Sequence, residues 1–318
     1  MRVGIVSWNT AQLLGDCLAA LPAALDGVDA EVVVVDNASA DSSAEVARQH
    51  AVQVVVNDRN LGYAVGMNQA LEGSEAPLLL ALNPDTIPAP GTLRRLVERF
   101  ADHPHAGVLV PRLTDEQGRP QDSAHRFPGP LVPIVASLST RSIRRSRLGR
   151  WLLLDGSGPH RGGNVDWAIG AVHLIRASAL GGEKPYDERS FMYAEDLDLC
   201  WRLTQRGAPT VLAEDVTVAH VGNAAGAQAW GDERSVRFWT ATYDVVRQRR
   251  SPLAARVAAL GASLAGVVSI LRTSPRAIAG GRRAQARRLL AVRRRELVVH
   301  LRTAVVGPIP SPTSPPAA

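Results

Sequence analysis

Glu195 and Asp196 are adjacent carboxylates that follow an aromatic, apolar stretch and begin a segment with helical spacing. Leu197, Trp201 and Leu203 recur on one side of this segment, so the predicted helix is amphipathic with one buried face. Carboxylates in a first helical turn point out of the N-terminus, where the macrodipole favours their ionised form. A general base is expected at such a position. Acidic residues are also ordinary at helix starts, and the pair alone does not decide between these readings.

Asp85 is a second candidate, because it closes the segment Asn83-Pro84-Asp85 directly after the apolar run 78–82. A carboxylate just beyond a buried strand is well placed to hold a hard divalent cation, which in turn binds phosphate oxygens. Asn, Pro and Asp also favour turns, so a plain turn remains an alternative reading of this segment.

The elements that position these residues follow an alternating strand and helix pattern, which predicts an α/β fold. The run Glu31 to Asp36 contains four consecutive β-branched valines, 32–35, as is typical of a strand buried on both faces of a parallel sheet. Further strands are predicted from Arg2 and over 52–56, 78–82 and 107–110, and helices over 13–21, 41–49, 64–71 and 93–100. Open α/β sheets bind ligands beyond the carboxyl ends of their strands, so the polar residues at those ends are functional candidates.

Five segments, in this order and spacing, together resemble the inverting family-two glycosyltransferases of the GT-A fold, especially the rhamnosyltransferase-like branch. The segments are Asp36 within VVDNAS, NLGYAVGMN from Asn60 to Asn68, Asn83-Pro84-Asp85, Trp167 to Ala171, and Glu195-Asp196-Leu197-Asp198. The resemblance spans about residues 1–225. It implies a Rossmann-like, mostly parallel central sheet flanked by helices, to which this chain adds a C-terminal helical extension.

The resemblance implies a nucleotide-diphosphate sugar as donor. Asp36 corresponds to the acidic residue that reads the base, and Asn60 and Gly62 to the loop that packs against the nucleotide. Asp85 matches the final carboxylate of the metal-binding Asp-X-Asp motif, whereas Asn83 departs from it and leaves one fewer charged ligand. The candidate donor-binding residues are Ser7, Asn9, Asp36, Asn60, Gly62, Asn68, Asn83 and Asp85.

The same resemblance makes Asp196 the catalytic base, with Glu195 in support, and His220 the histidine that completes the metal site with Asp85. Imidazole is a softer ligand than Mg²⁺ prefers, which favours Mn²⁺ or tolerance of either ion. Trp167, Gly170 and Ala171 resemble the wall of the acceptor site. A satisfied strand-end histidine and a core tryptophan remain the alternative readings of His220 and Trp167.

These residues support displacement at an anomeric carbon. A metal neutralises the nucleotide-diphosphate leaving group, and a base takes the proton of the acceptor hydroxyl. Because no separate nucleophile is evident, inversion is expected. Rhamnose from dTDP-rhamnose is the first choice of donor by resemblance; UDP-linked galactofuranose, glucose and N-acetylglucosamine stay open. A glycan or polyprenyl-linked acceptor in bacterial cell-envelope polysaccharide synthesis is expected.

Charge divides the chain unevenly: residues 1–240 carry a net charge of −6, and residues 241–318 carry +12 through 14 arginines. Small and apolar residues fill 253–271 almost completely, and 282–302 reads as a basic amphipathic helix suited to an anionic membrane surface. Two helices packed on the catalytic domain are the alternative. We therefore expect a catalytic domain over 1–230, a basic, membrane-associated helical segment over 231–306, and a disordered tail over 307–318.

Cys17 and Cys200 are the only cysteines, which gives no disulfide framework and favours a reducing compartment. No signal peptide is visible, so we expect a cytoplasmic protein, peripheral at the inner face of the plasma membrane. Nucleic acid is not an expected partner, because the arginines lack interleaved aromatic residues. A sugar-phosphate nucleotidyltransferase would need a Gly-rich basic loop where Ser7-Trp8-Asn9 stands, and a non-catalytic membrane-surface scaffold would have no use for the carboxylates.

Overall fold

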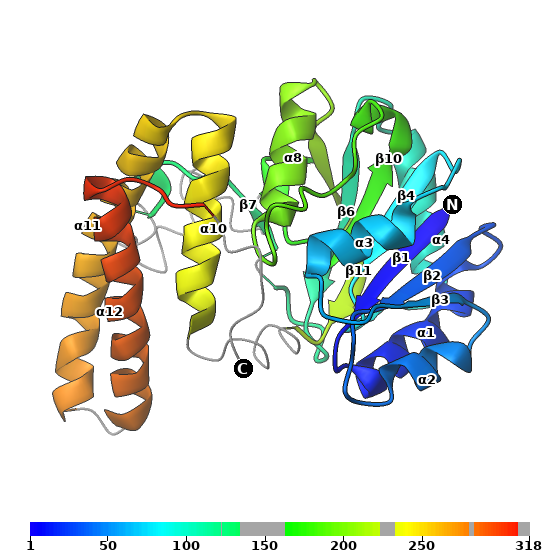
Figure 1. The fold of residues 1–318 in the computed structure, drawn as a ribbon, viewed down its shortest axis with the longest axis horizontal. Helices are drawn as coiled ribbons and strands as arrows, with labels where there is room; N and C mark the ends of the chain where they lie inside the picture. The colour runs from blue at the N-terminus through cyan, green and yellow to red at the C-terminus, as the bar shows by residue number, and fades with distance from the viewer. Residues whose placement is uncertain (122, 134–162, 223–232, 280–282, 311–318) are drawn as a thin grey trace.

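The computed structural model describes residues 1–121, 123–133, 163–222, 233–279 and 283–310. It has a mostly parallel central sheet with helices on both faces, followed by C-terminal helices (Figure 1). The α/β prediction is thereby confirmed. The strands are β1 (Arg2–Ser7), β2 (Glu31–Asp36), β3 (Gln53–Val56), β4 (Leu78–Leu82), β5 (Thr86–Ile87), β6 (Val108–Thr114), β7 (Ala124–His125), β8 (Asn164–Val165), β9 (Trp167–Ala168), β10 (Val172–Arg176) and β11 (Thr210–His220).

The sheet runs in the order β3-β2-β1-β4-β10-β6-β11-β5, with β8 added beside β11. β3, β2, β1 and β4 are parallel to one another, so their carboxyl ends lie at one edge. β10 enters antiparallel between β4 and β6, and β11 then pairs parallel with β6. Outside this sheet, β7 and β9 form a separate antiparallel pair.

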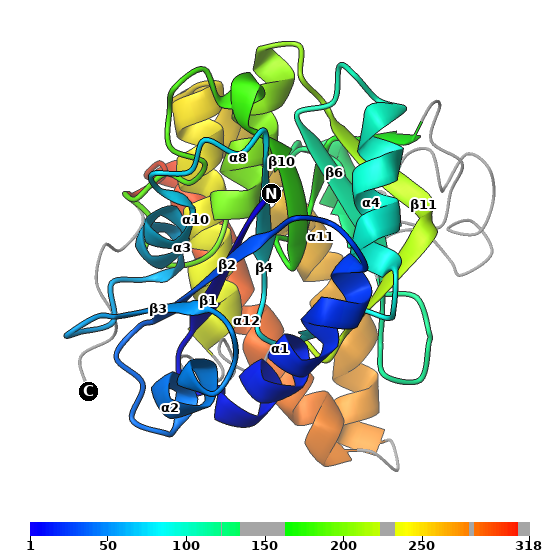
Figure 2. The same ribbon diagram turned by 90° about the vertical axis from the view of Figure 1, so that its right-hand side faces the viewer.

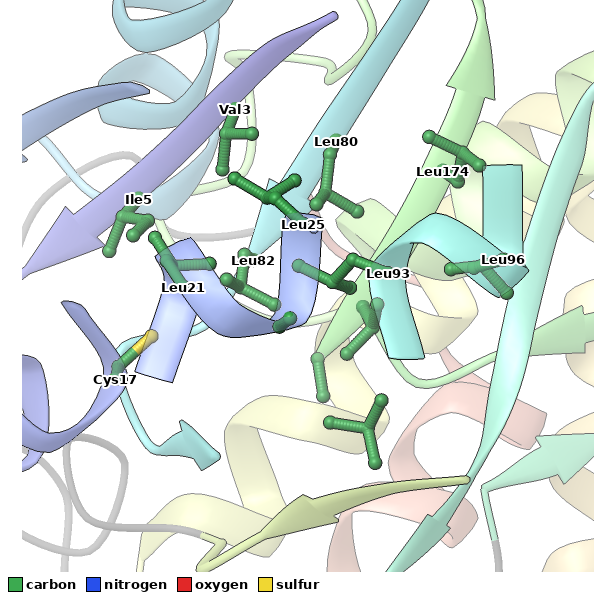
Figure 3. Packing of buried hydrophobic residues seen from close by; sticks show 14 of the residues in the cluster. Val3, Ile5, Cys17, Leu21, Leu25, Leu80, Leu82, Leu93, Leu96 and Leu174 are labelled. Atoms are coloured by element: carbon green, nitrogen blue, oxygen red, sulfur yellow. The ribbon is translucent and has the colours of Figure 1, made fainter. Parts of the chain in front are cut away.

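Helices cover both faces of the sheet (Figure 2). Along the chain, the described helices are α1 (Ala11–Leu25), α2 (Ser43–Arg48), α3 (Tyr63–Leu71), α4 (Thr92–Ala101), the 3-10 helix η2 (Ala177–Leu180), α8 (Glu195–Gln205), α10 (Arg234–Arg249), α11 (Pro252–Ala279) and α12 (Arg283–Val305). On one face, leucines of α1 and α4 pack onto β1 and β4 around Ile5 and Leu80 (Figure 3). On the other face, α3 and α8 pack around Met67 and Leu203. Burial on both faces fixes the register of the strands and hence the position of their ends.

The C-terminal helices are joined to the α/β part through α10. Asp198 in α8 is buried and receives hydrogen bonds from Arg202 at 2.9 Å and from Arg249 of α10 at 2.5 Å. α11 and α12 lie side by side as a helical hairpin next to α10 (Figure 1). The expected boundary at residue 230 and most of the expected tail over 307–318 lie outside the described residues.

α11 contains a stretch, Pro252–Ser274, that is long and apolar enough to cross a membrane by length and composition, and a third of its apolar window is buried within the protein. Its exposed side chains repeat at spacings of four and three residues, which places them on one face of the helix. These residues are Leu253, Val257, Leu260, Leu264, Val267 and Leu271. We call this set the apolar stripe of α11.

Candidate active site

A cavity of about 210 Å³ opens at the carboxyl edge of the parallel strands, against the start of α8. It collects residues from the ends of β1, β4 and β11 and from the segments before α3 and α8. Seven of the residues singled out in the sequence line it: Asn60, Asn83, Asp85, Gly170, Glu195, Asp196 and His220. The remaining ones lie elsewhere, as described below.

The carboxylate pair is presented by an unusual turn before α8. Tyr193 and Ala194 have left-handed φ values of 77° and 64°, so the chain reverses sharply and the helix begins at Glu195. Asp196 accepts the backbone N–H of Gly170 at 3.0 Å and that of Leu197 at 2.7 Å. By contrast, Oε2 of Glu195 has no hydrogen-bond partner among the described residues. The two neighbours therefore occupy different electrostatic environments.

Burial raises the pKa of both carboxyls above their ordinary values, and the charge of Asp196 raises that of Glu195 further. The two backbone N–H groups oppose the shift at Asp196, because hydrogen bonds to a carboxylate stabilise its charged form. When the pair shares one proton, that proton resides on Glu195. Asp196 is then the ionised member, which is the form a general base requires.

Gly170 keeps Asp196 in place through close approach. A Cβ at position 170 would lie 3.3 Å from the Asp196 Cβ, which is tighter than ordinary van der Waals contact. The Tyr63 hydroxyl donates to the Gly170 carbonyl at 3.4 Å. Burial first, and then the charges of Glu195 and Asp196, raise the pKa of Tyr63, so its hydroxyl stays protonated and remains a donor.

Asp85 and His220 face each other across the floor of the cavity, with Oδ1 of Asp85 3.4 Å from Nε2 of His220. Both side chains are buried. Oδ1 of Asp85 and Oδ1 of Asn83 are buried acceptors without a hydrogen bond from any described residue. Two unsatisfied oxygens beside an imidazole nitrogen are a donor set for a divalent cation.

Gln121 determines which nitrogen of His220 is available. The Gln121 amide nitrogen donates to the His220 carbonyl at 2.7 Å, so its Oε1 is the atom that meets His220 Nδ1 at 3.0 Å. Nδ1 must therefore carry a proton, and in the neutral ring Nε2 is a lone pair that points toward the Asp85 carboxylate. Two facing lone pairs repel unless the ring is protonated or a cation lies between them. The residues present fit a bound Mg²⁺ or Mn²⁺.

Within the described ranges, no cluster of three or more His, Cys, Asp or Glu side chains could hold a metal. The fit above rests on two such residues and the amide of Asn83. This is compatible with Mg²⁺-type sites, in which one or two protein carboxylates are complemented by substrate phosphate oxygens and water.

The loop before α3 is held by Asn37, which is buried. Its Nδ2 donates to Asn60 Oδ1 at 3.0 Å and to the Gly62 carbonyl at 3.1 Å, and its Oδ1 accepts the Leu61 N–H at 3.0 Å. Gly62 has φ 88°, and a Cβ there would fall on the Phe191 carbonyl oxygen. Only glycine fits this position, which joins the loop to the segment that leads into α8.

Residues 2–169 match the sequence profile of glycosyl transferase family 2. The chain belongs to glycosyltransferase family 2. The family resemblance drawn from the five sequence segments is thereby confirmed. An N-acetylglucosaminyl-diphospho-decaprenol L-rhamnosyltransferase of Mycobacterium tuberculosis is 29% identical over 206 residues. That match covers 59% of this chain and 66% of the relative, slightly less than two thirds of its length.

Solved structures show the same fold as this family-2 glycosyltransferase. A mannosyltransferase of Pyrobaculum calidifontis in complex with GDP-Man and Mn²⁺ aligns with a TM-score of 0.56 and 16% identity, over 96% of this chain and 87% of the other. A glucosyl-3-phosphoglycerate synthase of M. tuberculosis, in complex with Mn²⁺, uridine diphosphate and phosphoglyceric acid, aligns with a TM-score of 0.51 and 14% identity, over 78% and 77% of the two chains.

Five predicted donor residues do not line the cavity: Ser7, Asn9, Asp36, Asn68 and Gly62, the last of which holds the loop beside it. Asp36 is buried at the end of β2; its Oδ2 accepts the Ser39 N–H at 3.1 Å, and its Oδ1 has no partner within the described part of the chain. Ser7 shares a 2.7 Å hydrogen bond with Thr10. Asn9 joins two loops by accepting the Ala40 N–H at 2.7 Å. Of these, Asp36 retains a free acceptor for a ligand.

Asn68 lies deeper in the protein, on α3. Its Oδ1 accepts the Tyr186 N–H at 3.0 Å, and its Nδ2 donates to the Tyr186 carbonyl at 2.8 Å and to Glu188 at 3.0 Å. Its amide is thus engaged in linking α3 to the segment before α8. Asp198 also has a structural role, because its carboxylate accepts hydrogen bonds from Arg202 and Arg249 and so links α8 to α10.

The three predicted acceptor residues are separated by the structure. Gly170 lines the catalytic cavity, whereas Ala171 is fully buried in the core. Trp167 is 7% exposed and lines a second cavity, next to the C-terminal helices. Its indole N–H donates to the Arg126 carbonyl at 2.9 Å, and its ring lies against His125 with centroids 4.7 Å apart.

Sequence reasoning missed Asn37, Tyr63 and Gln121. Asn37 and Tyr63 lie inside segments that the sequence singled out, so their neighbourhood was a usable signal. Gln121 meets His220 across 99 residues of sequence, and no local pattern indicates that contact.

Proposed function

We propose that this family-2 glycosyltransferase is a metal-dependent, inverting enzyme that transfers a sugar from a nucleotide diphosphate to a hydroxyl of a glycan or lipid-linked acceptor. The observation that supports this most is the meeting of Asp196 with Asp85 and His220 in one cavity. One cavity thereby offers a base for the acceptor hydroxyl and a candidate cation site for the leaving diphosphate.

Asp196 accepts the proton of the acceptor hydroxyl as its oxygen attacks the anomeric carbon. Glu195 beside it is protonated, so Asp196 is not next to a second negative charge. Tyr63 and Gly170 fix the position of Asp196 through the hydrogen bonds described above. Asn68 and Asp198 support the scaffold. Of the carboxyls that line this cavity among the described residues, Glu195 keeps the shared proton and Asp85 faces the candidate cation site, so Asp196 is left to act as the base. This favours direct displacement, and therefore inversion.

The donor diphosphate is expected above Asp85, Asn83 and His220. These residues would hold Mg²⁺ or Mn²⁺, which supplies charge neutralisation for the departing diphosphate. Asp36, with its unpartnered Oδ1, is suited to accept a hydrogen bond from the base of the nucleotide. Asn60 and Gly62 shape the loop beside it, and Gln121 orients His220.

Rhamnose from dTDP-rhamnose is the donor we propose, and a polyprenyl-diphosphate-linked glycan the acceptor. The mycobacterial relative, an N-acetylglucosaminyl-diphospho-decaprenol L-rhamnosyltransferase, supports rhamnose as the sugar and a polyprenyl diphosphate as the carrier. We further propose that residues 1–230 act as the catalytic domain. Residues 231–306 attach it to an anionic membrane surface from the cytoplasmic side. The apolar stripe of α11 and exposed arginines of α12, such as Arg287, Arg288 and Arg294, are the surface chemistry such attachment needs.

A donor screen tests this proposal. Nucleotide sugars are added with Mn²⁺, with Mg²⁺ and with chelator, and the melting temperature is measured for each. We expect dTDP-rhamnose with metal to give the largest rise, and product analysis with a lipid-linked acceptor to show an inverted anomeric configuration. Failure of every nucleotide sugar to give a metal-dependent rise would remove the proposal.

A further inference from the structure

A second and larger cavity, of about 520 Å³, lies between the segment 125–133 and the helices α10, α11 and α12. This volume falls within the range of about 300–1,000 Å³ that is typical of small-molecule sites. Aromatic side chains form one wall: Trp167, Phe238, Trp239 and Tyr243. The family's nucleotide and metal residues are absent from its lining. It is therefore a site distinct from the catalytic cavity.

Small residues of α11 make another part of the lining. Ala258, Ala262, Ala265 and Gly266 line the cavity, so the space exists because these side chains are short. Gly261 allows the backbone of the segment 125–133 to approach α11 closely, because a Cβ at position 261 would lie 2.6 Å from the Pro130 Cα. The segment around Pro130 is thus packed directly on α11.

The polar groups at this cavity leave its interior largely uncharged. Tyr243 and His300 share a 2.8 Å hydrogen bond, and burial lowers the pKa of His300 to about 4, so the ring is neutral at physiological pH. Burial also raises the pKa of Glu296, which favours its neutral form. Arg126 and Arg293 line the same cavity and are its cationic groups. This composition suits an apolar chain that carries an anionic head.

The cavity lies beside the catalytic site. Trp167 in its wall is three residues from Gly170, which contacts Asp196. Tyr193, in the wall of the catalytic cavity, packs edge-on against Phe238 with centroids 6.4 Å apart. The linings of the two cavities are therefore linked by the short segment 167–170 and by one aromatic pair.

Its other boundary is the helix that bears the apolar stripe. Leu260 and Leu264 of the stripe are each two residues from a cavity-lining alanine, a rotation of about 200° at about 3.6 residues per turn. One face of α11 is therefore turned to the cavity and the opposite face to the surroundings. The cavity lies between the catalytic base and the side of the protein proposed to meet the bilayer.

We propose that this second cavity binds the isoprenoid chain of a polyprenyl-diphosphate acceptor. The inference rests on the proposed function for the identity of the acceptor. The apolar lining takes the chain, and the arginines at the cavity attract the diphosphate. The chain is thereby held next to the site where the sugar that it carries meets Asp196.

Binding of sugar-free probes to the full-length protein tests the inference. Farnesyl diphosphate, farnesol and inorganic diphosphate are titrated by calorimetry. We expect farnesyl diphosphate to bind at least about tenfold more tightly than inorganic diphosphate, because the chain adds buried apolar area. Ala262→Phe fills the cavity and should weaken farnesyl diphosphate at least about tenfold, while Val267→Phe, on the exposed face of the same helix, should leave it unchanged.

Thermal melts establish that each variant is folded. Independently of any variant, a photoreactive farnesyl diphosphate is cross-linked to the unmodified protein, and labelled peptides are expected from residues 125–133, 238–243 or 258–269. Equal affinity for farnesyl diphosphate and inorganic diphosphate would overturn the inference. So would equal effects of the two phenylalanine variants, or labelling confined to the apolar stripe. None of these probes carries a sugar, so failure of the donor assignment leaves this result interpretable.

Discussion

Replacing Asp196 by Asn removes the proposed proton acceptor while nearly preserving the size of the side chain. The fold is expected to survive at a modest cost. Asp196 accepts two backbone N–H groups, and an amide has a single oxygen, so one of these donors loses its partner. An unsatisfied donor costs about 1–3 kcal/mol. At about 2–4 °C per kcal/mol for a domain of this size, the melting temperature should fall by several degrees and donor binding should persist.

The effect on transfer should be much larger than the effect on stability. Loss of a general base lowers the rate by about 10²–10⁴-fold, equivalent to about 2.7–5.4 kcal/mol at about 1.36 kcal/mol per tenfold change. Burial raises the pKa of Asp196 to about 6. In the unmodified enzyme, kcat/KM should therefore increase with pH through about 6, since the base must be ionised. In Asp196→Asn, this limb of the profile should disappear.

The measurement is kcat/KM against pH for the parent, Asp196→Asn and Glu195→Gln, with melting temperature and donor affinity recorded for each. Burial, rather than the charge of Glu195, is the main cause of the shift at Asp196. Glu195→Gln should therefore keep the limb near pH 6 and lose less activity. Turnover of Asp196→Asn within a few-fold of the parent would refute the assignment. A limb that vanishes in Glu195→Gln instead would make Glu195 the base.

Further predictions concern the metal site, the membrane face and the helix junction. Asp85→Ala should abolish metal-dependent binding of the nucleotide diphosphate, measured by calorimetry with and without chelator, and equal binding under both conditions in the parent would contradict the premise. Gln121→Leu leaves Nδ1 of the histidine without its acceptor and should weaken Mn²⁺ binding, followed by electron paramagnetic resonance; about 10–100-fold is typical of such outer partners. Leu260→Gln with Leu264→Gln should reduce sedimentation with anionic vesicles without changing the melting temperature, and unchanged sedimentation would assign the helices to packing alone. Asp198→Ala removes the buried carboxylate that Arg202 and Arg249 share, while Arg202 keeps Glu183 at 3.2 Å and Arg249 keeps Asp187 at 3.7 Å. It should destabilise the protein by about 1.5–3 kcal/mol in urea unfolding, as for lost hydrogen bonds to charged groups; a loss below about 1 kcal/mol would show that the junction to α10 contributes little.

Local sequence pattern was sufficient for much of the fold. The bounds of β2 and β4 agree with the apolar runs from which they were predicted, and α8 begins at Glu195 as expected. These elements are buried on both faces or begin with a strong charge signal, so local and tertiary preferences agree. The predicted helix over 41–49 is shorter in the structure, Ser43–Arg48, and the strand predicted over 107–110 extends from Val108 to Thr114.

Long-range geometry was not available from the sequence. β10 enters antiparallel between two strands that are far from it in the chain, and the direction of a strand is not encoded in its own five residues. The side-chain amide of Asn68 bonds to Tyr186, which is 118 residues away in the sequence. The sequence therefore could not show that Asn68 has a structural contact and is not directed at a ligand. Trp167 similarly faces a cavity that exists only because the C-terminal helices pack nearby.

The proposed cation site has one carboxylate among the described residues, Asp85, because Asn83 stands where the Asp-X-Asp motif has an aspartate. A divalent cation held by one carboxylate, an amide oxygen and a neutral imidazole keeps a net positive charge. That charge makes the cation weakly held by the protein alone and strongly attracted to a diphosphate. By thermodynamic reciprocity, the factor by which the donor strengthens metal binding equals the factor by which the metal strengthens donor binding. The cation is therefore expected to enter and leave with the nucleotide, which suits an enzyme that must release a nucleotide diphosphate after every transfer.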